Sequence, residues 1–138
     1  MYNRYTIDNT IFKIAIYIRL SREDGDDMES ESVTNQRSLL NGYLKAQNLV
    51  AVDIYIDDGY TGTNFERPDF KRMLNDIEKG KINMVITKDL SRLGRDHIMT
   101  GYYVETYFPE NDVRYIAVND DIDTFYETSG SDMMPFKL

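Results

Sequence analysis

Short apolar runs alternate with amphipathic segments along most of the chain. Four of the runs are rich in β-branched or aromatic residues, which is typical of strands buried on both faces of a sheet. These predicted strands lie at residues 12–20, 50–56, 84–87 and 113–118. Because the segments between them have helical spacing, the pattern predicts an α/β fold. We expect a mostly parallel central sheet of about four or five strands with helices on both faces.

The helix predicted after the second strand has the clearest signals. Proline is well tolerated at the first position of a helix, so Arg67-Pro68 marks its start, and Gly80 marks its end. Its apolar residues recur at helical spacing, at positions 70, 73, 74 and 77. One face of this helix is therefore expected to be apolar.

Two further helices are predicted, one before this helix and one after it. The earlier helix follows Ser30 or Ser32, either of which can cap its start, and Gln36 interrupts its apolar face. The later helix covers about residues 97–108 and ends near Pro109. With this alternation, the loops that follow the parallel strands are expected to meet at one edge of the sheet.

The 138 residues are predicted to form a single domain, long enough to bury roughly two thirds of its unfolded surface. Residues 1–10 lack periodicity and are expected to be a loose leader, whereas the acidic residues 23–31 are expected to form an exposed loop. The acidic residues 119–124 are also expected to form a loop. Apolar residues at an abrupt end suggest that residues 125–138 begin a truncated C-terminal segment.

The composition excludes several classes of site. With no cysteine, the chain has no disulfide and no thiolate metal site, which suits a reducing cytosol. A single histidine, His97, leaves histidine-rich metal sites and a Ser-His-Asp triad poorly supplied. No apolar run approaches the roughly 20 residues of a membrane span, and no signal-peptide pattern opens the chain. The net charge of −8 predicts that any contact with nucleic acid is local or depends on another part of a longer protein.

Three of the strand-end loops carry groups suited to a phosphodiester. Arg19 and Ser21 lie at the end of the first strand, and the next two loops contribute Arg67, Arg92 and Arg95. Guanidinium groups match the non-bridging oxygens of a phosphate, stay charged at any working pH and lower the pKa of a nearby hydroxyl. The pattern therefore predicts Ser21 as a nucleophile for an anionic substrate.

Other interpretations of these loops stay open at this point. Ser91 and Ser32 are rival nucleophiles, and the arginines could instead pair with neighbouring aspartates. Six aspartates that follow strands could hold a hard cation such as magnesium, as in a metal-dependent phosphohydrolase or a phospho-acceptor domain. They are Asp57, Asp58, Asp89, Asp120, Asp121 and Asp123. A non-enzymatic oligomerisation or regulatory module is the third hypothesis.

Three ordered motifs resemble those of the serine recombinase (resolvase/invertase) family. Residues 17–21 (YIRLS) resemble the nucleophile motif, with Gln36 on the following helix. Residues 58–62 (DGYTG), followed by Arg67-Pro68, resemble the second motif. Residues 90–96 (LSRLGRD) resemble the third and most specific motif. The resemblance implies a resolvase-like catalytic domain.

The tail of the chain resembles one branch of that family. The segment NDDIDT at 119–124, together with MPF at 134–136, is similar to the large serine recombinases of mobile elements such as transposons. Two positions depart from the family pattern. Thr61 stands where many members have serine, and Ser91 stands where the small resolvases have aspartate, so no carboxylate role is carried over to position 91.

The resemblance implies site-specific DNA recombination through a covalent intermediate. A serine attacks a DNA phosphodiester and forms a 5′-phosphoserine link, after which strand exchange and religation follow without ATP. The implied catalytic residues are Ser21, Arg19, Arg92, Arg95, Arg67, Asp58 and Gln36. The implied phosphate ligands are Arg19, Arg67, Arg92 and Arg95, with Asp58 also orienting the site and Gln36 giving a supporting polar contact. No metal or other cofactor is implied.

The resemblance also implies the partners of the domain. These are double-stranded DNA recombination sites, contacted mainly through DNA-binding domains absent from this chain, and further copies of the protein in a dimer and a synaptic tetramer. No membrane contact is implied. Because the chain is acidic, we expect it to bind DNA weakly by itself and to recombine it poorly or not at all. The implied location is the bacterial cytoplasm, with nucleoid association when the protein is on DNA.

Overall fold

The structure, a computed structural model, describes residues 11–21 and 32–127. The predicted leader at 1–10, the predicted loop at 23–31 and most of the predicted C-terminal segment lie outside the described residues. Within the described ranges, no helix has the length and apolar character needed to cross a membrane.

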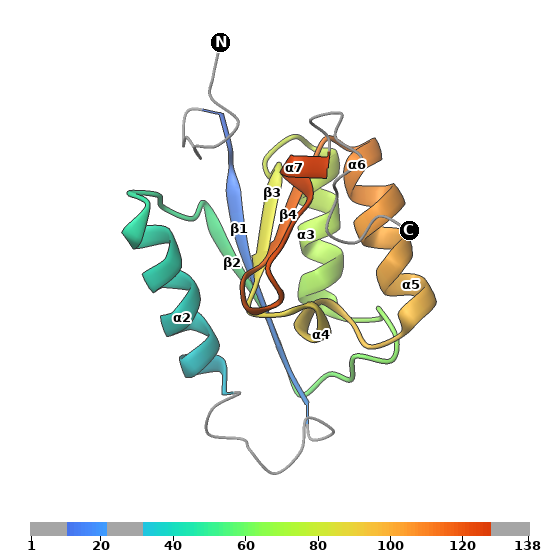
Figure 1. The fold of residues 1–138 in the computed structure, drawn as a ribbon. Coiled ribbons are helices and arrows are strands. Elements are labelled where there is room, and N and C mark those ends of the chain that lie inside the picture. The colour runs from blue at the N-terminus through green and yellow to red at the C-terminus, as the bar shows by residue number, and fades with distance from the viewer. Residues whose placement is uncertain (1–10, 22–31, 128–138) are drawn as a thin grey trace.

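A five-stranded sheet forms the centre of the molecule, in the order β2-β1-β3-β4-β5 (Figure 1). Its strands are β1 (Ile14–Leu20), β2 (Asp53–Asp58), β3 (Met84–Thr87), β4 (Arg114–Ala117) and β5 (Ile122–Asp123). β1 pairs in parallel with β2 and β3, and β3 pairs in parallel with β4, whereas β5 is antiparallel to β4. The predicted α/β class with a mostly parallel sheet is confirmed.

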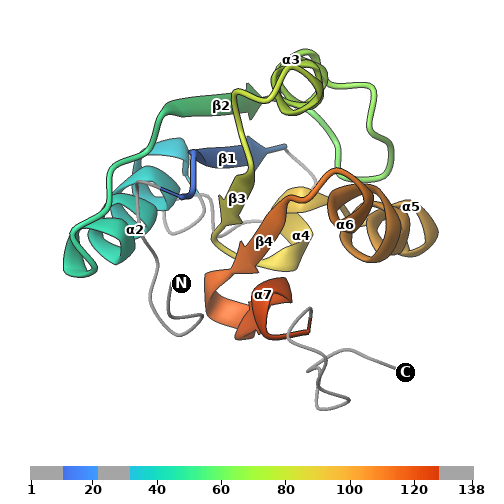
Figure 2. The same cartoon turned by 90° about the horizontal axis from the view of Figure 1, so that it is seen from above.

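Helices cover both faces of this sheet, as the view from above shows (Figure 2). α2 (Val33–Ala46) packs on one face, and α3 (Pro68–Glu78) packs on the other. A longer helical segment lies beside α3 and is made of α5 (His97–Tyr102), the π-helix Tyr103–Tyr107 and α6 (Phe108–Glu110). Two short helices, α4 (Leu90–Leu93) and α7 (Thr124–Glu127), follow β3 and β5.

The central strand β1 supplies apolar side chains to both hydrophobic cores. Ala15 and Tyr17 belong to the core under α3, whereas Ile14, Ile16 and Ile18 belong to the core under α2. Successive strand residues point to opposite faces, so a strand covered on both faces is apolar at most of its positions. This explains why the first predicted strand is nearly continuously apolar, with Lys13 and Arg19 as its charged residues.

The boundaries of β2 differ from the predicted strand at residues 50–56. Val50 and Val52 are 70% and 60% exposed and precede the strand, so their β-branched character does not reflect burial in the sheet. At the other end, Asp57 and Asp58 are expected from the sequence to follow the strand but are the last residues of β2, where they pair with the end of β1. The strand therefore reaches further toward the carboxyl edge of the sheet than the sequence predicts.

Three other segments differ from the expectations. Pro109 does not end its helix but lies in the first turn of α6, where a residue without an N–H group is tolerated. The loop predicted at 119–124 instead contains a short 3₁₀ turn and β5. The segment after β3, expected as a loop, contains α4, whose start is capped by the Asp89 side chain.

β2 lies at an edge of the sheet, and side chains bind three of its outer backbone groups. The Ile54 N–H donates to the Asp53 carboxylate at 2.7 Å, and the Ile56 N–H donates to Asp69 at 2.8 Å. Arg72 Nη2 donates to the Ile54 carbonyl at 3.2 Å, and Arg72 Nη1 lies 2.9 Å from the Asp53 carboxylate. Unpaired strand edges invite pairing with another chain, so this arrangement protects the fold from edge-to-edge association.

We expect Asp69→Asn to weaken the fold in a pH-dependent way. Burial raises the pKa of Asp69, but hydrogen bonds from Arg72 and the Ile56 N–H outweigh it, so this pKa lies below its usual value. The ionised form therefore stabilises the folded state above the unfolded-state pKa, and this contribution is lost as the pH falls through the lowered folded-state pKa. Urea unfolding should show a loss of about 1 kcal/mol in the free energy of unfolding at pH 7 and a smaller difference at pH 3.

Glu110→Gln, which changes an exposed carboxylate, is the control for this comparison and should leave the free energy of unfolding within about 0.5 kcal/mol. An equal effect of both substitutions at pH 7 would show that Asp69 does not stabilise the edge of β2.

Candidate active site

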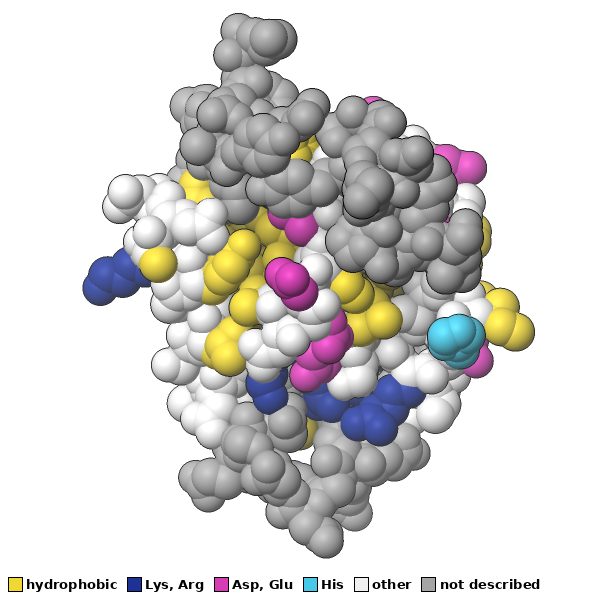
Figure 3. All heavy atoms as spheres, in the orientation of Figure 1, with side chains coloured by type: hydrophobic (Ala, Val, Ile, Leu, Met, Phe, Trp, Pro, Cys, Tyr) yellow, Lys and Arg dark blue, Asp and Glu magenta, His cyan; other side chains and the backbone are white. Residues whose placement is uncertain are grey.

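The carboxyl ends of β1, β2 and β3 bring the three sequence motifs together at one edge of the sheet. This edge lies at the bottom of Figure 1, beside α4. The parallel register pairs Arg19 with Asp57 and Leu20 with Asp58, so the first and second motifs are neighbours. In the space-filling view, basic side chains form a row along this lower edge, with acidic side chains directly above them (Figure 3).

The Arg19 side chain connects all three motifs. It is fully buried, and each of its nitrogens donates to a backbone carbonyl: Nη1 to Tyr60 at 3.1 Å, Nη2 to Ser91 at 2.6 Å, and Nε to Arg92 at 3.3 Å. A buried charge is tolerated only when hydrogen bonds replace its hydration. Arg19 therefore holds the loops after β2 and β3 against the end of β1.

The backbone of Arg19 collects two further predicted site residues. Its carbonyl accepts hydrogen bonds from Gln36 Nε2 at 3.0 Å and from Arg92 Nη1 at 3.1 Å. Gln36 and Arg92 are both buried, and Arg92 Nε also lies 3.6 Å from the Asp89 carboxylate. The polar interruption predicted on the apolar face of α2 is thus a contact with the end of β1.

Ser21 lies two residues after Arg19 and is 5% exposed. The carbonyl before it, that of Leu20, accepts the N–H groups of Gly59 at 2.6 Å and Tyr60 at 3.1 Å. Gly59 has φ of 96°, a conformation that favours glycine, so the turn after β2 folds back onto β1 at this point. The predicted nucleophile therefore lies at the junction of the first and second motifs.

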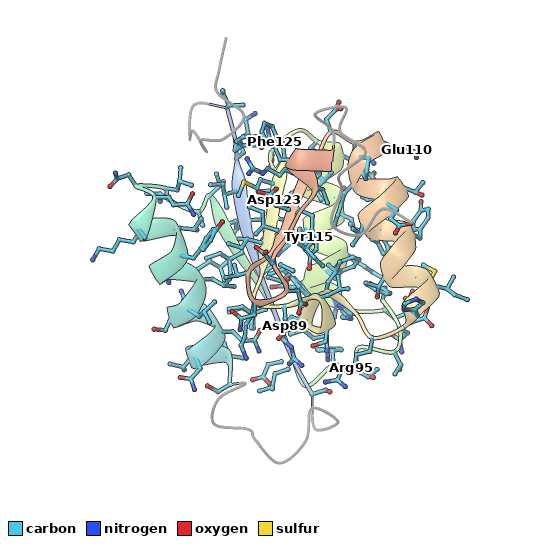
Figure 4. The ribbon with its side chains drawn as sticks, in the orientation of Figure 1. Asp89, Arg95, Glu110, Tyr115, Asp123 and Phe125 are labelled. Carbon is cyan, nitrogen blue, oxygen red and sulfur yellow. The ribbon has the colours of Figure 1, made fainter. Side chains whose placement is uncertain are left out.

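Gly62 joins the second motif to Arg95 of the third. Its carbonyl accepts the Arg95 N–H at 2.7 Å. A Cβ atom at position 62 would lie 2.8 Å from both Arg19 Nη2 and Arg95 Cγ, so only glycine fits between these two side chains. Arg95 is exposed and lies at the lower edge of the molecule in Figure 4.

Arg67 is buried behind this edge and faces the core. Its Nη1 donates to the Tyr17 hydroxyl at 3.0 Å and to the Leu93 carbonyl at 2.7 Å, and its Nε donates to the Asn64 carbonyl at 3.0 Å. Burial raises the pKa of the Tyr17 phenol, more than the nearby Arg67 lowers it, so Tyr17 stays protonated and can donate to Asp57. Arg67 thus links β1, the loop after β2 and the residues just after Arg92.

Asp57 is a site residue that the motif assignment passed over in favour of Asp58. Its carboxylate accepts the Tyr17 hydroxyl at 2.8 Å and the N–H groups of Asp69 and Phe70, each at 2.9 Å. It therefore connects β1 to the start of α3, whereas Asp58 is exposed at the end of β2. The signal in the sequence was a tyrosine inside an otherwise apolar strand, since a buried hydroxyl needs a polar partner.

Two of the other aspartates that suggested a metal site accept hydrogen bonds at the start of α4. Asp89 accepts the Arg92 N–H at 3.2 Å and the Ser91 hydroxyl at 2.7 Å, and Asp120 accepts the Leu90 N–H at 2.6 Å. Asp123 lies far from Asp89 and Arg95 in Figure 4, where it pairs with Arg114 at 2.6 Å. Among the residues that the structure describes, no three His, Cys, Asp or Glu side chains are grouped as metal ligands.

The two rival nucleophiles also have structural roles. Ser32 caps α2 by accepting the Asn35 N–H at 3.1 Å, and Ser91 donates to Asp89 within the α4 turn. His97 is exposed at the start of α5. Ser32 therefore caps a helix and Ser91 contacts the capping residue of α4, whereas Ser21 lies at the junction of the motifs.

Comparison with known proteins assigns the chain to a family. Residues 14–136 match the family model described as "Resolvase, N terminal domain". The chain belongs to the resolvase N-terminal domain family. This match covers all three motifs and confirms the resemblance drawn from them.

Solved structures agree with this assignment. The N-terminal catalytic domain of TP901-1 integrase is 33% identical, with a TM-score of 0.74 over 87% of this chain and 83% of that one. A resolvase family site-specific recombinase from Streptococcus pneumoniae is 26% identical, with a TM-score of 0.67 over 88% of this chain and 79% of that one. The predicted resolvase-like catalytic fold is thus confirmed for this domain.

Among curated proteins, a putative DNA recombinase of Bacillus subtilis is 31% identical over 108 residues. That alignment includes 78% of this chain but 21% of the relative, so the chain spans about a fifth of the relative's length. An uncharacterized immunity region protein 3 of Bacillus phage phi105 is 33% identical over 73 residues, 53% of this chain and 88% of that protein.

We expect Asp57→Asn to destabilise the resolvase-type domain far more than Asp58→Asn. An amide oxygen cannot replace a carboxylate that accepts three buried or half-buried donors, so the Asp57 variant should lose about 2 kcal/mol in the free energy of unfolding. The exposed Asp58 variant should stay within about 0.5 kcal/mol of the unmodified chain. Urea unfolding at pH 7 measures both, and similar losses for the two variants would contradict the assignment of Asp57.

Proposed function

We propose that the protein containing this domain recombines DNA at specific sites through a covalent serine intermediate. Ser21 Oγ attacks the phosphorus of a phosphodiester and loses its proton. The bond from phosphorus to the 3′ oxygen breaks, and that oxygen leaves as a hydroxyl after it takes up a proton. The 5′-phosphoserine link preserves the energy of the broken bond, so the reverse attack by another 3′-hydroxyl rejoins strands without ATP.

The observation that carries this proposal is the convergence of all three motifs on the residues next to Ser21. Arg19 contacts both other loops, and Arg92 donates to the Arg19 carbonyl at 3.1 Å. Preorganised positive charge of this kind stabilises the negative charge that develops on phosphate oxygens in the transition state. It also favours the ionised form of the attacking hydroxyl.

We assign different roles to the four arginines from their burial. Arg95 is exposed and makes the first contact with the scissile phosphate. Arg19 and Arg92 are buried, and their positive charges stabilise the negative charge of the phosphate without direct contact. Arg67 orients the third motif from the core side. Its Nη2 has no hydrogen-bond partner within the described ranges, which supports its further role as a phosphate ligand. Gln36 fixes the end of β1 through its hydrogen bond to the Arg19 carbonyl, and Asp58 orients the exposed edge of the site at the end of β2.

The proposed partners follow from the same site and from the charge of the chain. The substrate is double-stranded DNA that carries a recombination site, and the reaction takes place in a synaptic tetramer assembled from dimers. A chain with a net charge of −8 has little general attraction for DNA, so we assign site recognition to other parts of a longer protein. The domain alone is then a weak or inactive recombinase. Its location in the cytoplasm and its association with the nucleoid stay predictions.

The test uses the protein in which this domain occurs, DNA with its recombination site, and EDTA in the reaction. After denaturation, cleaved DNA should carry protein on its 5′ ends. Ser21→Ala should abolish this adduct while DNA binding stays unchanged, because the substitution removes the attacking oxygen and leaves every arginine in place.

Ser91→Ala is the matched control, since Ser91 is also a serine at this edge and was a rival nucleophile. It should keep the adduct, with the capping contact to Asp89 lost. An adduct that survives Ser21→Ala, or that disappears only when EDTA is added, would overturn the proposal.

A further inference from the structure

Phe65 lies directly against the backbone of the third motif. A Cβ atom at Gly94 would lie 2.3 Å from Phe65 Cζ and 3.0 Å from Phe65 Cε1. The backbone of Gly94 is extended, with φ of −176° and ψ of 158°, which any residue can adopt. Glycine is therefore required at position 94 for space, because the phenyl ring and Thr100 Oγ1, which would lie 2.6 Å from the Cβ atom, occupy the volume that a side chain would fill.

The same ring supports the Arg67 guanidinium. Arg67 Cζ lies 4.3 Å from the centroid of the Phe65 ring, within the range of a cation–π contact. Arg67 Nη1 in turn donates to the Leu93 carbonyl at 2.7 Å. Phe65 thus acts on two consecutive residues, on Gly94 by direct contact and on Leu93 through Arg67.

The ring has little room to move away from these contacts. It is 8% exposed, and its centroid lies 5.1 Å from that of Phe70 on α3 and 4.8 Å from that of Tyr103 in the π-helix. Rings packed this closely leave no void into which the Phe65 ring could shift away from Gly94. The position of Gly94 is therefore fixed from the core side.

We propose that Phe65 is a positioning residue for the recombination reaction, an inference that rests on the proposed function. Leu93 and Gly94 are the two residues between Arg92 and Arg95. By fixing these two residues, the Phe65 ring sets the distance and direction between the buried Arg92 guanidinium and the exposed Arg95 guanidinium. An error of about 1 Å in the placement of a catalytic group can cost on the order of 100-fold in rate.

The test combines Phe65→Leu, Gly94→Ala and the double variant in the protein that contains this domain. Each single change should slow adduct formation on the order of 10- to 100-fold while DNA affinity stays unchanged. The first removes the support for Gly94, and the second pushes the loop away from the ring. In the double variant the smaller side chain at position 65 relieves the contact of the new methyl group with the ring, although the contact with Thr100 Oγ1 stays, so its rate should exceed the product of the two single effects.

Phe108→Leu is the matched control, because Phe108 is a fully buried phenylalanine of the same aromatic cluster whose ring packs on Tyr103, Tyr107 and Tyr115. It should lower stability about as much as Phe65→Leu and leave the rate of adduct formation unchanged. Equal slowing by the two leucine variants would show that Phe65 acts only through stability and would overturn the proposal.

A measurement that does not depend on catalysis separates this inference from the proposed function. In NMR spectra of the 138-residue chain, the aromatic ring shifts the Gly94 α-proton signals, and Phe65→Leu should remove that shift while Phe108→Leu keeps it. If the adduct survives Ser21→Ala but the ring shift of Gly94 is seen, the packing of Phe65 on Gly94 is confirmed and the proposed function is wrong. A Gly94 signal that is unchanged in Phe65→Leu overturns the packing itself.

If Phe65→Leu does not fold, Phe65→Tyr tests the same contact. The added hydroxyl extends from Cζ, the atom that lies against Gly94, so it should disturb the Gly94 and Arg95 signals and slow adduct formation. Tyr103→Phe, which removes a hydroxyl from the neighbouring ring, should change neither. A Phe65→Tyr variant with the rate of the unmodified protein overturns the proposal.

Discussion

The buried Arg19 guanidinium is the interaction on which the rest of this edge depends. A charge without access to water has to be compensated by hydrogen bonds, and three carbonyls from two other loops provide them. The cost of leaving this charge uncompensated makes the approach of the loops an obligatory part of the fold. A group that sequence reasoning assigns to phosphate binding is therefore also the structural centre of the site.

A second buried arginine continues this arrangement along the third motif. Arg19 binds the carbonyls of Ser91 and Arg92, and Arg67 binds the carbonyl of Leu93, so three consecutive carbonyls are held by two guanidinium groups. This fixes the backbone from which the Arg92 and Arg95 side chains project. The electrostatics of the site are thus preorganised by charges that the fold itself has to bury.

The fold and the choice of loops could be predicted from the sequence because both depend on local patterns. The nearly continuous apolar run of β1 indicates burial on both faces, and Arg67-Pro68 indicates a helix start. The end of β2 could not be predicted, because aspartates resemble turn residues until their partners in β1 are known. The preference for Asp58 over Asp57 has the same origin, since burial and a tyrosine partner come from tertiary structure.

The roles of the arginines were also beyond the sequence. A sequence motif does not distinguish an arginine that binds a backbone carbonyl from one that binds a ligand. The structure does, because Arg95 is exposed whereas the other three arginines of the site are buried. The small residues were equally uninformative, because Gly62 and Gly94 are required by close side chains from other elements and not by their own backbone angles.

Hydrogen exchange in an Arg19→Lys variant of this chain tests most directly whether Arg19 assembles the site. Lysine keeps the charge, but its donors are all on one nitrogen, which cannot occupy the three positions from which Nε, Nη1 and Nη2 of Arg19 reach the separate carbonyls. The amides of Gly59, Tyr60 and Arg95, which now donate to backbone carbonyls at this edge, should exchange about tenfold faster or more, while those of β3 stay protected. Arg37→Lys on the exposed side of α2 should change none of them. Unchanged exchange at these three amides in Arg19→Lys would contradict the account.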